Sequence, residues 1–106
     1  MDGALMEKLW SWVRFTGATA AILQNRRCTS VVRNGAGDYQ IVIDQALDAA
    51  ESCIWVAAEG AVPVEWSYVH TSDTSKQLLA LNNAGAATDP TTVMFKIYQI
   101  AYGTGL

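Results

Sequence analysis

The segment Asn34-Gly35-Ala36-Gly37-Asp38 lies between two short stretches rich in β-branched and aromatic residues, Cys28–Arg33 and Tyr39–Asp44. Asn and Gly accept the positive φ angles at both central positions of a tight hairpin turn, and a further glycine accommodates a β-bulge. Alternate residues of the second stretch, beginning with Tyr39, are apolar. The sequence therefore predicts an antiparallel hairpin whose tight turn is Asn34-Gly35.

Strand-like segments recur along the rest of the chain at short spacing, separated by turn residues. The apolar segment Thr19–Gln24 is suited to a buried strand, whereas Val62–His70 alternates apolar and polar residues. The longest candidate is Val93–Tyr102, whose second face carries tyrosines and suits either a protein interface or a second core face. The remaining candidates are Trp10–Phe15, Cys53–Ala58 and Gln77–Leu81. About seven strands of this kind predict an all-β fold, an antiparallel β-sandwich or barrel.

Three segments do not have clear strand character. Residues 1–9 form either a short helical turn or an extended N-terminal arm, and Gln45–Ser52 forms a loop or a single helical turn because two helical turns are marginal alone. Asn82–Thr92 is rich in turn residues and predicts a surface loop that could contact a partner. With 106 residues and no linker, the chain is expected to form a single domain over residues 1–106.

Charged residues make up 16% of the chain, against about 25% in an average globular protein. Two explanations remain open: burial of part of the surface in an oligomer or larger assembly, or a surface rich in Ser, Thr, Ala and Asn. A net charge of −3 without a basic patch predicts no nucleic-acid partner. No apolar run approaches the roughly 20 residues of a membrane span, so no membrane association is expected.

Few residues could support chemistry. His70 is the one histidine, so a structural zinc site is excluded, and the neighbours Ser72 and Asp73 do not make a triad by adjacency alone. Asp44, Asp48 and Glu51 are expected to form a solvated acidic face. We therefore expect no catalytic residue, no metal and no cofactor. No signal peptide is visible, so Cys28 and Cys53 are expected as free thiols in a protein made in a cytoplasm.

Four tryptophans, Trp10, Trp12, Trp55 and Trp66, are many for so short a chain. The core is expected to take two or three of them, and the others could form an interface or a sugar-stacking platform. Trp10 and Trp12 share a strand face with Arg14, which favours a semi-exposed position for that pair. The predicted interface residues are Trp10, Trp12, Arg14, Tyr98 and Tyr102.

Two blocks of the chain resemble a small β domain that recurs in tailed-phage virion structural proteins. Trp12, Val13, Phe15 and Gly17 match a Trp-Val-x-Phe-x-Gly pattern. A second block, containing an Asn-Gly-x-Gly-Asp-Tyr pattern, is matched by Val31, Asn34, Gly35, Gly37, Asp38 and Tyr39. The chain departs from the family at Cys28, where a branched apolar residue is usual, and at Gln45–Ser52, which lacks the usual proline.

The resemblance implies a non-enzymatic component of a virion, made in the cytoplasm of a bacterial host. Because the chain from Met1 to Leu106 contains no fibre shaft, we expect a capsid decoration or cement protein. Such a protein would bind between subunits of the major capsid protein, as a homo-oligomer (dimer or trimer). The alternative is a tail-fibre or head-appendage domain that binds a host receptor or carbohydrate.

Overall fold

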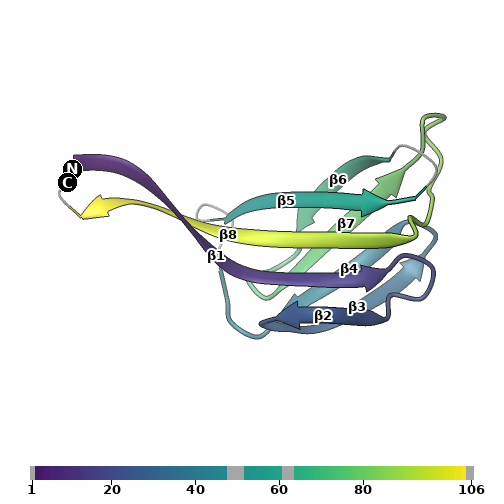
Figure 1. Ribbon diagram of the computed structural model, residues 1–106, viewed down its shortest axis with the longest axis horizontal. Coiled ribbons are helices and arrows are strands. Elements are labelled where there is room, and N and C mark those ends of the chain that lie inside the picture. The colour runs from purple at the N-terminus through teal and green to yellow at the C-terminus, as the bar shows by residue number, and fades with distance from the viewer. Residues whose placement is uncertain (1, 48–51, 61–63, 105–106) are drawn as a thin grey trace.

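The computed structural model describes residues 2–47, 52–60 and 64–104, with side chains described for 9–47, 52–60 and 64–100. Every described strand pairing is antiparallel. Figure 1 shows the strands, which are β1 (Asp2–Thr16), β2 (Ile22–Arg26), β3 (Cys28–Gly35), β4 (Asp38–Ile43), β5 (Ser52–Glu59), β6 (Glu65–His70), β7 (Ser75–Leu81) and β8 (Thr92–Thr104).

The strands form two four-stranded sheets, ordered β2-β1-β8-β5 and β3-β4-β7-β6, which pack face to face. The predicted antiparallel sandwich is confirmed, with eight strands where about seven were expected. The described residues contain no helix, and so none that could cross a membrane. Of the two alternatives for residues 1–9, the structure has the extended one, because Asp2–Thr16 is a single strand.

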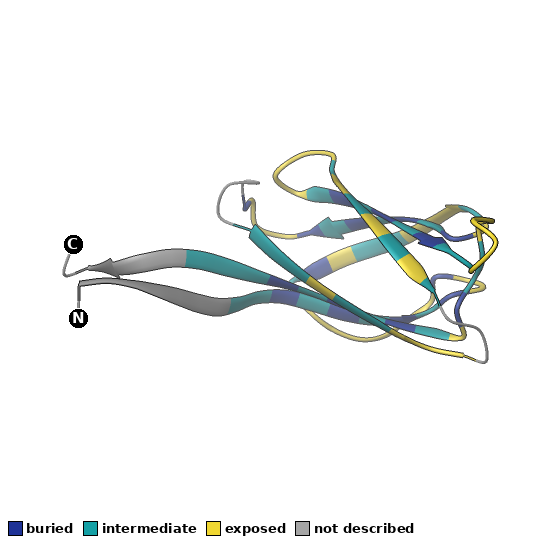
Figure 2. Cartoon of the chain, turned by 90° about the horizontal axis from the view of Figure 1, so that it is seen from above, coloured by how far each residue is buried: buried dark blue, intermediate teal, exposed yellow. Residues whose placement is uncertain are grey.

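The core lies between the sheets and is built from alternate residues of their central strands, as the burial colours in Figure 2 show. Tyr39, Ile41 and Ile43 of β4 are buried, as the alternation predicted, and so are the inward residues of β1 and β8. Phe15 meets Tyr39 edge to face, with ring centroids 5.0 Å apart. The other central strands add the fully buried apolar side chains of Val13, Leu78, Ala80, Val93, Phe95 and Ile97.

The predicted hairpin forms between β3 and β4, but its tight turn is Ala36-Gly37 and the Asn34-Gly35 assignment is wrong. Gly37 has the positive φ, at 62°, and the register shift lies between Arg33 and Gly35. The cause is tertiary. A Cβ on Gly37 would lie 2.4 Å from the carbonyl oxygen of Ala80, so only glycine allows the turn to pack against β7.

Strand β2 differs from the prediction in its bounds and in its burial. Thr19–Gln24 was expected to be a buried strand, but the strand begins at Ile22 and all five of its residues are exposed. The reason is position: β2 is the edge of its sheet and pairs only with β1 among the described strands. An edge strand beside the bulged end of β1 does not cover the core.

Strands β1 and β8 are much longer than the other strands, and their pairing continues beyond the sandwich. Leu5 pairs with Tyr102 and Asp2 with Thr104, which forms a two-stranded ribbon that carries both chain termini (Figure 1). The molecule therefore extends over 46 × 27 × 22 Å.

Candidate functional site

The two sheets present very different outer faces. On the outer face of β3-β4-β7-β6, aliphatic residues mix with polar side chains that bond across strands, such as Gln77 Nε2, which donates to Asp38 Oδ1 at 3.0 Å. The described outward positions of this sheet hold no aromatic residue and no Lys or Arg. This composition is typical of the solvated face of an antiparallel sheet.

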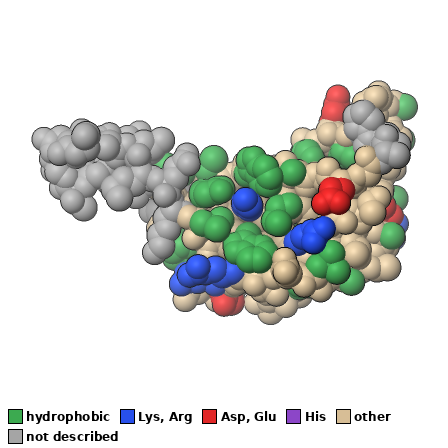
Figure 3. Space-filling view, viewed as in Figure 1, with side chains coloured by type: hydrophobic (Ala, Val, Ile, Leu, Met, Phe, Trp, Pro, Cys, Tyr) green, Lys and Arg blue, Asp and Glu red, His purple; other side chains and the backbone are tan. Residues whose placement is uncertain are grey.

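The outer face of β2-β1-β8-β5 is apolar and aromatic instead. Trp55 on the edge strand β5 is 47% exposed. Figure 3 looks onto this sheet and shows hydrophobic side chains gathered around a basic one. We call this surface the aromatic face, defined by Trp12, Cys53, Trp55, Met94 and Tyr98 at outward positions of three adjacent strands.

Strand register aligns four of the outward side chains of this sheet in one row. Arg26 of β2 pairs with Trp12 of β1, Trp12 pairs with Lys96 of β8, and Lys96 pairs with Trp55 of β5. The row thus alternates cation, aromatic, cation, aromatic. The Lys96 ammonium lies 4.7 Å from the centre of the Trp55 ring, a cation–π contact.

A shallow pocket of about 120 Å3 adjoins the row, with Ala57, Ala58 and Met94 among the residues that line it. Its other lining residues are Arg14, Glu59 and Thr92. Arg14 Nη2 and Glu59 Oε1 lie 3.5 Å apart, with side chains 38% and 71% exposed. Such an exposed ion pair contributes little, so either partner can be replaced by an incoming group.

Charge is unevenly distributed between this face and the rest of the molecule. The described outward positions of the sheet carry Arg14, Arg26 and Lys96 against Glu59 alone, a net charge of +2. The whole chain has 7 basic and 10 acidic residues, a net charge of −3, so the remaining residues have a net charge of −5. The aromatic face is therefore a basic surface on an acidic protein.

Of the predicted interface residues, the structure brings Trp12, Arg14 and Tyr98 together on this sheet face. Trp10 does not share the face of Trp12 as predicted, and its interface role stays a prediction. A bulge between Leu9 and Ser11 breaks the alternation, and Trp10 packs against the core with the Arg27 guanidinium 5.2 Å from its ring centre. Tyr102 pairs with Leu5 in the ribbon, and its side chain lies outside the described part.

Sequence reasoning did not assign Trp55, Met94 or Lys96 to a site. Alternation along Val93–Tyr102 already placed Lys96 on the same face as Tyr98, which was the one available signal. The row itself depends on the register between four strands, which no local pattern encodes. Trp66, like Trp10, packs against the core, so the core takes two of the four tryptophans.

His70 belongs to a structural cluster at the end of β6. The Lys76 ammonium, fully buried, donates to the carbonyl oxygens of Leu47 (3.0 Å) and Ser72 (2.7 Å) and to His70 Nδ1 (2.9 Å). With Nδ1 accepting, His70 Nε2 donates to Asp73 Oδ1 at 3.1 Å. Lys76 and Asp73 thus engage both imidazole nitrogens, and no described hydrogen bond joins the Ser72 hydroxyl to His70 as a nucleophile and its base would be joined.

Strand β7 begins at Ser75, and Lys76 on this strand faces the core although it is charged. The carbonyl oxygens around its ammonium replace the water that burial removes. The cluster therefore closes one end of the sandwich.

The acidic and thiol groups offer no further chemistry in the described residues. Asp44 is exposed, while Asp48 and Glu51 lie outside them, and no described group of His, Cys, Asp and Glu could hold a metal ion. Cys28 and Cys53 are free thiols, as expected. Burial raises the pKa of the Cys28 thiol to about 11, so it is inert as a nucleophile at neutral pH.

Comparisons with known proteins return no match, either to a protein-family model or to a curated protein or solved structure. Functional inference therefore depends on the geometry of this chain. Its most distinctive surface is the aromatic face.

Proposed function

We propose that this chain is a structural protein of a phage virion, a capsid decoration protein that attaches to the major capsid protein through the aromatic face. The observation that carries the proposal is the aromatic face, on which Trp55 is exposed and Trp12, Met94 and Tyr98 lie half-buried beside it on the outer side of one sheet. The outward side of an antiparallel sheet is ordinarily polar, and the opposite sheet of this molecule mixes polar and aliphatic side chains there but has no aromatic residue at its described outward positions. An exposed aromatic sheet face is typical of a surface that a partner covers.

The shape and composition of the face favour a protein partner over a small molecule. Trp, Tyr, Met and Arg, the types enriched at interface cores, are all present here. The adjoining pocket, at about 120 Å3, is well below the roughly 300 Å3 of the smaller ligand sites. It is large enough for part of one side chain of a partner, and the surrounding strands offer a broad contact area.

The virion assignment is supported by the two blocks that resemble the phage β domain. Their members contact each other in this fold: Phe15 packs on Tyr39, and the Tyr39 hydroxyl lies 2.8 Å from the Gly17 carbonyl oxygen. The two blocks therefore pack against each other, and each holds the other in position. Trp12, a member of the first block, lies on the aromatic face.

Attachment would work by removing apolar surface from water. Each Å2 of apolar area buried at a joint between capsid subunits contributes about 25 cal/mol before the costs of association. We expect bound copies to form dimers or trimers at these joints. Each contact is modest, but because the same contacts are repeated over the whole capsid shell, together they make the shell more resistant to mechanical stress.

Co-sedimentation of the purified protein with expanded capsids of its own phage tests the proposal. We expect saturable binding at symmetric positions, weakened about tenfold or more by Trp12→Ser or Trp55→Ser, because central tryptophans are frequent hot spots. Val69→Ser, on the outer face of the other sheet and 43% exposed in the wild type, is the matched control and should leave binding unchanged. A folded wild-type protein that does not sediment with capsids would contradict the proposal.

A second candidate, a tail-fibre or head-appendage domain that binds host carbohydrate, is favoured by one observation. Trp12 and Trp55 lie on the same open sheet face, where sugar rings could stack. Against it, the Lys96 ammonium occupies one side of the Trp55 ring. Glycan-array binding that is lost in Trp12→Ser, together with no capsid binding, would replace the leading proposal with this one.

A further inference from the structure

We infer that the aromatic face recognises an acidic protein segment, whose carboxylates pair with Lys96 and Arg26 of the cation–aromatic row. The inference rests on the proposed function in one respect, that this face is the attachment surface. It goes further by stating the chemistry of the partner: a segment that carries Asp or Glu and one apolar anchor residue.

Among the side chains that the structure describes, neither cation of the row has a hydrogen-bond or ion-pair partner. The described ion pairs involve Arg14, Arg33 and His70, and none involves Lys96 or Arg26. The cation–π contact of Lys96 with Trp55 leaves the ammonium N–H donors without an acceptor in the described part of the chain. Amino groups held in an apolar surface and unpaired gain most from a carboxylate that arrives with the partner.

The spacing of the row suits more than one carboxylate. Arg26 on β2 and Lys96 on β8 are separated by β1, so their backbones are two strand spacings apart, about 10 Å. Trp12 lies between them and supplies apolar contact. A partner therefore meets two positive positions with an aromatic surface between them.

The pocket is the place where the apolar anchor residue of the partner would bind. Met94, which lines it, is two residues from Lys96 on β8, a distance of about 6.8 Å along the strand. Side chains two residues apart in an extended partner segment have the same spacing and point the same way. An apolar side chain in the pocket thus places a carboxylate two residues away at the Lys96 ammonium.

Charge also argues against two other occupants. A second copy docked through the same face would oppose one +2 surface with another, which like-charge contact disfavours. A nucleic acid would find only three cations on this face, in a chain whose other residues have a net charge of −5, and Lys96 already covers one side of the Trp55 ring. An acidic polypeptide needs only the face itself.

The direct test uses the isolated, 15N-labelled protein and poly-L-glutamate as the probe. We expect amide shifts confined to β1, β5, β8 and Arg26, which disappear when salt is raised to about 1 M because screening then acts over about 3 Å. Lys96→Met keeps the apolar stem and should weaken binding about tenfold. Arg27→Met removes the same charge outside the row, where the Arg27 guanidinium lies over Trp10, and should change binding less than twofold.

Four results would overturn the inference: no shifts with poly-L-glutamate, equal binding by Lys96→Met, an equal response to poly-L-lysine, or tighter binding of oligo-dT to the same residues. The capsid assay separates this inference from the proposed function. Poly-L-glutamate binding without capsid binding removes the capsid assignment and leaves acidic recognition standing. Capsid binding that Lys96→Met does not weaken removes acidic recognition and leaves the attachment face.

Discussion

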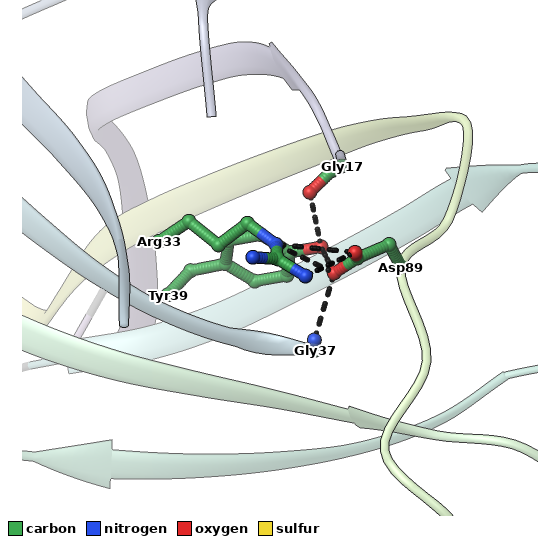
Figure 4. Close-up of polar contacts among 5 residues, drawn as sticks. All are labelled: Gly17, Arg33, Gly37, Tyr39 and Asp89. Atoms are coloured by element: carbon green, nitrogen blue, oxygen red, sulfur yellow. Dashed lines mark hydrogen bonds and ion pairs between the residues drawn. The ribbon is translucent and has the colours of Figure 1, made fainter. Parts of the chain in front are cut away.

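Arg33 and Asp89, separated by 56 residues, form a bidentate ion pair in which Arg33 Nη2 lies 2.7 Å from Asp89 Oδ2 and Nε lies 3.2 Å from Oδ1. The same carboxylate accepts the Gly37 amide at 2.8 Å and lies 2.9 Å from the Tyr39 hydroxyl, as Figure 4 shows. One aspartate from the 82–91 loop thus ties the β3–β4 hairpin to the connection between β7 and β8. The loop, predicted as a surface contact element, has exposed residues from 83 to 87 but is anchored by Asp89.

Asp89→Ala should lower the free energy of unfolding by about 2 kcal/mol, because it removes the carboxylate that accepts from the Gly37 amide and lies beside the Tyr39 hydroxyl. Urea denaturation measures this free energy. The control is Asp44→Ala, which replaces an exposed aspartate and should change the free energy of unfolding by less than about 0.5 kcal/mol. Equal losses in the two variants would show that the carboxylate contributes no more than a surface charge.

The stabilisation contributed by Asp89 should depend on pH. The Arg33 hydrogen bonds hold the pKa of Asp89 below its ordinary value of 3.8, so the folded state favours the charged form. Its stabilisation is then complete above pH 3.8 and is lost as the pH falls below that value. The difference between wild type and Asp89→Ala should therefore shrink in acid. A difference that stays constant between neutral and strongly acidic pH would contradict the predicted ionised pair.

Gly37→Ala and Gly35→Ala should differ sharply although the two glycines are only two residues apart in the sequence. Gly37 has φ +62° and its new Cβ would meet the backbone of Ala80 and Thr88, so we expect a loss of about 3 kcal/mol or more. A Cβ on Gly35 meets nothing within 4 Å and should be tolerated. Thermal denaturation of the two variants compares them, and the reverse order would place the turn at Asn34-Gly35.

Lys76→Met should be strongly destabilising, by about 3 kcal/mol, because it removes a buried hydrogen-bond donor from the carbonyl oxygens of Leu47, Ser72 and Asp73. Lys96→Met makes the same chemical change on the open face of the other sheet and should cost under about 1 kcal/mol. The free energies of unfolding in urea give the comparison. Similar values for both would mean that Lys76 is not enclosed as described.

Tyr39 and Tyr68, which both contribute to the core, should respond oppositely to loss of the hydroxyl. The Tyr68 hydroxyl is buried without a hydrogen-bond partner in the described residues, so Tyr68→Phe should stabilise the fold by about 1 kcal/mol. Tyr39→Phe should destabilise it by a similar amount, since its hydroxyl lies within hydrogen-bonding distance of Gly17 O and Asp89. Burial raises the pKa of Tyr68 to about 12, so absorbance at alkaline pH should report its ionisation only near unfolding.

Local pattern was sufficient for most of the secondary structure. Alternation placed Tyr39, Ile41 and Ile43 on a buried face and put Lys96 and Tyr98 on the opposite face of β8 from Phe95. Such patterns succeed because side chains alternate with a period fixed by the extended backbone. Where the backbone departs from that period, at the bulge beside Trp10, the prediction of its face was wrong.

The sequence by itself determined the fold class, the hairpin and the alternating core residues, since each depends on neighbours within a few positions. Only the tertiary structure decided that Gly37 makes the turn, that β2 lies exposed at an edge, and that Lys76 is enclosed by carbonyl groups. It also decided that Arg26, Trp12, Lys96 and Trp55 stand in one row. The physical reason is register: pairing between strands distant in sequence sets which side chains meet, and one shifted residue changes every contact that follows.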